Sequence, residues 1–164
     1  TISKNQYQIL LREIKDSYKE IGCALKIYNK PIIWKRRGDS PNFGERSGYY
    51  DIEKKRAMIV FFGNIGRARK LQIILHELRH AQHHNKGLYK DYYEGKWRRI
   101  FFEEKFIPKK MPNLEVGLEA EIDCNKFAYY WLKKRGVEIP KDFSYNLETT
   151  AEVATRIIKE RKSK

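Results

Sequence analysis

The sequence predicts a single domain of the α+β class, and three observations support this prediction. The chain has 164 residues, which is the length of one ordinary domain. Hydrophobic residues make up 41% and aromatic residues 13% of the chain, enough to close a core despite a mean hydropathy of -0.76. The local patterns follow the order helix, small sheet, helix, linking region, helix, helix, without regular alternation of strands and helices.

The N-terminal part of the chain is expected to form one helix and a small, mostly antiparallel sheet. Residues 3–21 carry apolar side chains at helical spacing, with Ser3 as an N-cap and Gly22 as the stop. Four short apolar runs predict strands at residues 24–28, 32–34, 48–52 and 57–62. The last two form a predicted hairpin with a buried second strand. We expect that second strand to align an extended peptide by edge pairing.

The C-terminal part is expected to be helical. Apolar periodicity and breaker residues predict helices at residues 67–85, 114–134 and 148–161. Residues 87–112, between the first two of these helices, are dense in aromatic and cationic side chains. We interpret this region as a basic, aromatic-rich insertion in the single domain 1–164.

The cysteines and histidines restrict the kind of metal site that the chain can build. The two cysteines lie far apart, so no disulfide framework or cysteine-rich zinc site is predicted. All four histidines fall within nine residues, at positions His76, His80, His83 and His84. Any metal is therefore expected to be held by nitrogen and oxygen ligands.

Residues 76–80 read HELRH, an HExxH motif on the predicted helix. Two histidines four residues apart stand on one helical face, so both His76 and His80 can reach one Zn²⁺ ion. Glu77, beside the first histidine, is placed to act as a general base toward a metal-bound water. Leucine and isoleucine side chains occupy the opposite face, and Ile73 lies between the two histidines, so the helix is expected to be covered on both sides.

The third ligand is expected to be a carboxylate. His84 lies ~12 Å along a straight helix from His76, and His83 would need a break in the helix to join the site. No histidine follows residue 84, so the extended motif with a third histidine is absent.

The best candidates for this carboxylate lie on the predicted helix at residues 114–134. Glu121 projects from the rim of its apolar face, which suits a ligand that must reach inward. Asp123 occupies the other rim and is a rival, whereas Glu119 projects almost to the opposite side. Asn125, one turn after Glu121, is placed to orient a ligand by hydrogen bonding.

Three segments together resemble the ImmA/IrrE family of zinc metallopeptidases, small zincins that are common in phages and mobile elements. Residues 48–62 (GYYDIEKKRAMIVFF) look like the hairpin of that family. Residues 67–84 (RARKLQIILHELRHAQHH) resemble its HELGH helix, and residues 121–128 (EIDCNKFA) are similar to its ExxANxFA helix. Arg79 stands where the family has glycine, Cys124 stands where it has alanine, and no helix-turn-helix module is recognisable.

The resemblance implies a zincin-like fold in which His76, His80 and Glu121 bind zinc and Glu77 is the general base. It also implies an endopeptidase that cleaves an intracellular protein substrate, such as a repressor or another regulator. In the expected mechanism, a tyrosine after the histidine helix could stabilise the oxyanion, although packing is the commoner role of such a residue. The tyrosines in this position are Tyr89, Tyr92 and Tyr93.

The charge of the chain suggests an acidic partner. There are 35 Lys and Arg residues against 21 Asp and Glu residues, a net charge of +14. Within the insertion, cations alternate with aromatic side chains, a pattern that is typical of single-stranded nucleic-acid binding. The contact candidates are Lys96, Trp97, Arg98 and Arg99. The alternative to a peptidase is therefore a nucleic-acid-binding protein, or a protease of DNA-bound proteins, on the same scaffold; an acidic protein partner would use the same charge.

The cellular setting is expected to be the cytoplasm of a bacterial, archaeal or infected host cell. No run approaches the ~18 apolar residues that a membrane span needs, and the first residues lack the layout of a secretion signal. We therefore expect no membrane partner.

Overall fold

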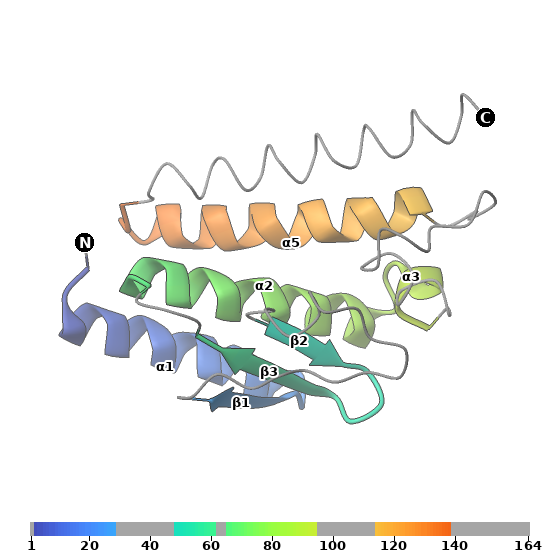
Figure 1. The fold of residues 1–164 in the computed structure, drawn as a ribbon, viewed down its shortest axis with the longest axis horizontal. Helices are drawn as coiled ribbons and strands as arrows, with labels where there is room; N and C mark the ends of the chain where they lie inside the picture. The colour runs from blue at the N-terminus through green and yellow to red at the C-terminus, as the bar shows by residue number, and fades with distance from the viewer. Residues whose placement is uncertain (1, 29–47, 62–64, 95–113, 139–164) are drawn as a thin grey trace.

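The computed structural model describes residues 2–28, 48–61, 65–94 and 114–138. It confirms the α+β class (Figure 1). The helices and strands are α1 (Lys4–Glu20), β1 (Ala24–Tyr28), β2 (Gly48–Asp51), β3 (Arg56–Val60), α2 (Arg67–Lys86), α3 (Lys90–Glu94) and α5 (Leu114–Lys134). The strand expected at 32–34, the helix expected at 148–161 and most of the insertion lie outside the described residues.

The sheet is mixed, with strand order β1-β3-β2. β3 pairs in parallel with β1 and antiparallel with β2, with Ala57 opposite Tyr50 in the predicted hairpin. The expectation of a mostly antiparallel sheet is wrong for the described strands, because one of the two pairings is parallel. β3 also cannot align a peptide, since β1 and β2 occupy both of its edges. β2 is an edge strand of the sheet, and it contacts α2.

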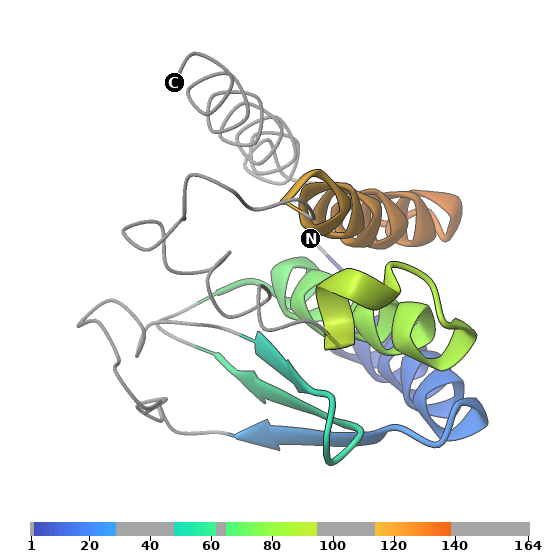
Figure 2. The same cartoon turned by 90° about the vertical axis from the view of Figure 1, so that its right-hand side faces the viewer.

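Helix α2 lies at the centre of the fold (Figures 1 and 2). Helix α5 covers one side of α2, and the sheet and α1 cover the other. This arrangement confirms that α2 is covered on both faces. The core between these layers consists of side chains that are 0–1% exposed, among them Ile14, Ile59, Leu71, Ile74 and Leu78. Buried Tyr18 ties α1 to α2, because its hydroxyl donates to the carbonyl oxygen of Ile74 at 2.6 Å.

The ends of the helices follow the local signals in the sequence. The side chain of Ser3 accepts a hydrogen bond from the backbone N–H of Gln6, as an N-cap does. Helix α2 continues one residue beyond the prediction and ends at Gly87, whose φ of 70° is the left-handed conformation that glycine adopts readily. None of the helices in the described part of the chain is long and apolar enough to span a membrane.

Candidate metal centre

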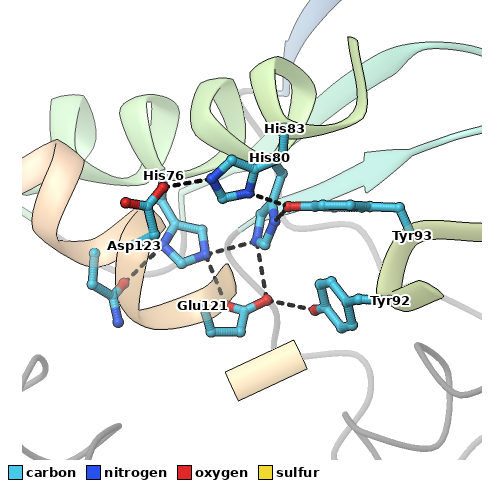
Figure 3. A network of polar contacts seen from close by, with 8 residues as sticks. His76, His80, His83, Tyr92, Tyr93, Glu121 and Asp123 are labelled. Carbon is cyan, nitrogen blue, oxygen red and sulfur yellow. Dashed lines mark hydrogen bonds and ion pairs between the residues drawn. The ribbon is translucent and has the colours of Figure 1, made fainter. Parts of the chain in front are cut away.

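The HExxH helix and α5 bring three predicted ligands together (Figure 3). The Nε2 atoms of His76 and His80 lie 3.1 Å apart. The Glu121 carboxylate contacts both histidines: Oε2 is 3.1 Å from His76 Nε2 and Oε1 is 3.0 Å from His80 Nε2. A tetrahedral zinc ion with bonds of ~2.0–2.1 Å needs ligand atoms ~3.3–3.4 Å apart. A movement of the two imidazoles and the carboxylate apart by a few tenths of an ångström would therefore accommodate the ion.

Each of the three predicted ligands also forms a hydrogen bond with a further side chain. His76 Nδ1–H donates to the Oδ1 atom of Asn125 at 2.7 Å, which is the orienting contact predicted for that residue. His80 Nδ1 lies 2.6 Å from the hydroxyl of Tyr93, and the hydroxyl of Tyr92 donates to Glu121 Oε1 at 2.7 Å.

These hydrogen bonds make the centre suitable for a cation. Because the amide oxygen of Asn125 can only accept, His76 carries its hydrogen at Nδ1, and the neutral ring has its lone pair at Nε2. That lone pair faces the Glu121 carboxylate, which also offers only lone pairs. Two acceptors at this distance attract each other only when a positive charge lies between them. The donor set therefore fits a divalent metal ion.

The pKa shifts in the metal-free protein indicate the same preference for positive charge. Burial lowers the pKa of His76, but the hydrogen bond and the negative charge of Glu121 outweigh it and raise this pKa from 6.5 to about 9. Burial raises the pKa of Glu121, yet the charge of His80 and the hydrogen bonds from both histidines hold it well below its usual range. A proton is thus held where a metal would bind, and the two compete.

Cys124 is a further donor at this centre, so the expectation that only nitrogen and oxygen atoms are available to a metal is wrong. The sequence patterns missed it because the two cysteines are far apart and Cys124 comes near the histidines only when α5 packs on α2. Ligand atoms of His76, His80 and Cys124 all lie within 4.8 Å of one another, so this group could hold a metal ion. The thiol is completely buried one turn after Glu121, and burial, followed by the charges of Glu121 and Glu77, raises its pKa well above the usual range. A metal would have to displace the thiol proton. The ionised Glu121 carboxylate needs no such step.

Glu77 lies on the side of α2 that faces the sheet, and it is 7% exposed. It packs against Gly48, the first residue of β2: a Cβ atom added there would lie 2.8 Å from Glu77 Oε1. Its charge helps to raise the pKa of His76, so the two side chains interact electrostatically. Glu77 is therefore a buried carboxylate that packs against the first residue of β2 and interacts electrostatically with His76.

The other candidates lie around this centre. The rival Asp123 is bound by Arg79 and His83, at 2.8 and 2.5 Å, so its carboxylate is engaged elsewhere. Glu119 is exposed, whereas His84 contacts the hydroxyl of Tyr50 at 2.8 Å. The four nucleic-acid contact candidates at residues 96–99 lie outside the described residues.

Helix α3 is the element of the site that sequence reasoning missed. It has five residues, too few for a periodic pattern, and it brings Tyr92 to Glu121 and Tyr93 to His80. Both tyrosines are buried, 1% and 3% exposed. The signal that was available was the position of three tyrosines directly after the histidine helix.

No protein-family model matches the chain, and neither does any curated protein or solved structure. The resemblance to the ImmA/IrrE family therefore stays a prediction, and the function is argued from the geometry of the centre.

Proposed function

We propose that the chain is a zinc-dependent endopeptidase with a zincin-like fold. The observation that carries this proposal is the convergence of His76 Nε2, His80 Nε2 and the Glu121 carboxylate within 3.1 Å, with Glu77 buried beside them. Two imidazoles and one carboxylate are the ligand set of catalytic zinc sites that keep a position open for water.

Zinc, when bound, would lower the pKa of a coordinated water and polarise the scissile carbonyl. The protein residues supply the remaining steps. Glu77 would accept the proton of that water and return it to the leaving amine. Asn125 and Tyr92 hold His76 and Glu121 in place through the hydrogen bonds described above.

The substrate proposed from the resemblance is an intracellular protein, such as a repressor or another regulator. β2 rather than β3 is the strand that would align its main chain, because β2 lies at the rim of the sheet and touches both α2 and Glu77. Main-chain pairing depends little on sequence, so specificity would come from other contacts.

Metal analysis combined with two variants tests this proposal. Purified wild-type protein should contain one zinc per chain, and His80→Ala should lose it. Glu77→Gln should keep the zinc but abolish cleavage of an unfolded protein mixture, monitored by mass spectrometry. A wild type that binds no metal, or a Glu77→Gln variant with full activity, would refute the assignment.

The third ligand is tested with cobalt in place of zinc. We expect Glu121→Gln to weaken Co²⁺ binding strongly and Cys124→Ala to leave it nearly unchanged. The wild-type spectrum should lack a thiolate-to-cobalt charge-transfer band. The opposite pattern would identify Cys124 as the ligand.

The net charge of +14 favours a second candidate function, nucleic-acid binding. It predicts an affinity for single-stranded DNA or RNA that falls steeply with salt and that decreases when Arg98 and Arg99 are both replaced by Ala. Absence of binding at low salt would remove this candidate.

A further inference from the structure

The outer side of α5, which faces away from α2, carries a stripe of lysines and tyrosines. The stripe consists of Lys126, Tyr129, Tyr130, Lys133 and Lys134. These positions follow the spacing i, i+3, i+4, i+7 and i+8, so they share one face of the helix. The opposite face of α5 packs on α2, and its side chains Cys124, Ala128 and Leu132 are completely buried. The stripe is therefore a surface feature of α5, on the side away from the metal centre.

The side chains of the stripe are accessible to a partner. Tyr130 is 61% exposed, and the three lysines are exposed as well. Tyr129 is partly buried, and its ring meets the ring of Tyr130 at an angle of 89°, with the centroids 5.1 Å apart. The Nζ atom of Lys133 lies 5.8 Å from the centre of the Tyr129 ring. Tyr129 thus supports Tyr130 from one side, while most of the Tyr130 side chain stays open to solvent.

The stripe is positively charged, and no acidic residue interrupts it. Residues 124–137 contain four Lys and Arg residues and no Asp or Glu. One of the four, Arg135, is engaged by an ion pair with Glu13, whereas the three lysines form no ion pair within the described part of the chain. The nearest acids of α5 are Glu119 and Asp123, and ion pairs with α2 already hold Asp123. The charge of the stripe therefore fits an anionic partner.

We propose that this stripe binds single-stranded nucleic acid, with Tyr130 stacking on a base and the lysines contacting phosphates. Cations that follow the backbone and an exposed aromatic ring that stacks on bases are the two components of single-strand binding. A duplex would use the lysines alone, because its bases are stacked on one another. An acidic peptide or an anionic membrane would likewise use only the charge. The exposed tyrosine is thus the observation that favours a single strand.

The proposal goes beyond the proposed peptidase, and it gives the second candidate function a binding surface on described residues. It also predicts how lysines and tyrosine differ in their response to salt. Each lysine that contacts one phosphate of a single strand contributes about −0.7 to the slope of log affinity against log salt, so three contribute about −2. The contribution of Tyr130 should change little with salt, because stacking on a base releases no counterions.

Fluorescence anisotropy with a labelled oligo(dT) or oligo(U) strand tests the proposal on the full chain. Tyr130→Ala should bind about 5–150-fold more weakly at every salt concentration with an unaltered slope, and Tyr130→Phe should bind like wild type. The triple variant Lys126→Gln, Lys133→Gln, Lys134→Gln should lower the magnitude of the slope by about 2. The matched control replaces three exposed lysines of α1, Lys4, Lys15 and Lys19, by Gln and should keep the wild-type slope.

Two kinds of result would overturn the proposal. One is absence of binding at low salt, or equal affinity of Tyr130→Ala and wild type. The other is displacement of the labelled strand by duplex DNA, poly-glutamate or anionic vesicles as readily as by an unlabelled single strand, because charge alone would then explain binding.

Failure of the stripe can be told apart from failure of the proposed functions. If the Arg98→Ala, Arg99→Ala variant loses binding while Tyr130→Ala keeps it, only the stripe is refuted and nucleic-acid binding stands. The zinc content and peptide hydrolysis of the wild type test the peptidase alone, because the stripe lies on the side of α5 away from the metal centre.

Discussion

The free energy of unfolding of the metal-free protein is expected to fall by about 2 kcal/mol between about pH 7 and pH 8.5. The cause is His76, whose pKa rises from 6.5 to about 9 because Glu121 outweighs the effect of burial. The folded chain keeps this proton up to about pH 9, whereas the unfolded chain releases it near 6.5. The stabilisation is therefore complete below pH 6.5 and is lost as the pH rises through 9. It amounts to about 3 kcal/mol in all, rather more than half of it within the stated interval.

Urea denaturation in the presence of a chelator measures this change. Glu121→Gln should remove most of the pH dependence, because it removes the partner that raises the pKa. Glu13→Gln, which breaks the exposed ion pair with Arg135, should retain it and serves as the control. The interval stops at pH 8.5 because buried Cys23, with its pKa raised to about 11, lowers stability at higher pH. A flat or rising wild-type curve, or an equal fall in Glu121→Gln, would refute the reasoning.

Four further predictions concern the position of Glu77, the stability at acidic pH, a buried hydrogen bond in the core and the proton released on zinc binding. Gly48→Ala would place a Cβ atom 2.8 Å from Glu77 Oε1, so the carboxylate must move; we expect unchanged zinc content but peptide hydrolysis about 10–100-fold slower, and equal rates would contradict this. Burial lowers the pKa of His83 to about 4, so stability present above pH 6.5 is lost on acidification. Urea denaturation should record a loss of about 2–3 kcal/mol at about pH 4.5, and the loss should be smaller in His83→Asn. Tyr18→Phe removes a buried hydrogen bond to the Ile74 carbonyl and should cost about 1 kcal/mol of unfolding free energy without changing the zinc content; altered zinc content would show that this contact also shapes the metal centre. Zinc binding near neutral pH should release about one proton, measured by calorimetry in buffers of different ionisation enthalpy, and no release would mean that no proton occupies the centre.

Most of the described helices were predictable because their signals are local. Apolar spacing identified α1, α2 and α5, and Ser3 and Gly22 marked the two ends of α1. The hairpin was predictable for the same reason, since its two strands are separated only by a short charged turn. The short α3 and the parallel pairing of β1 with β3 were not, because a five-residue helix has no period and the pairing joins segments about 30 residues apart.

The candidate site likewise has features that local sequence determines and features that only tertiary contacts decide. The spacing of the HExxH motif by itself placed His76 and His80 on one helical face, and the lack of later histidines indicated a carboxylate; both conclusions follow from helix geometry and composition. The tertiary structure alone decided which ring nitrogens face each other, because that depends on hydrogen-bond partners from α3 and α5. It also decided that Asp123 is engaged by Arg79 and His83 rather than by the histidine pair. The direction of a hydrogen bond is a property of two groups, and here the second group is supplied by a distant part of the chain.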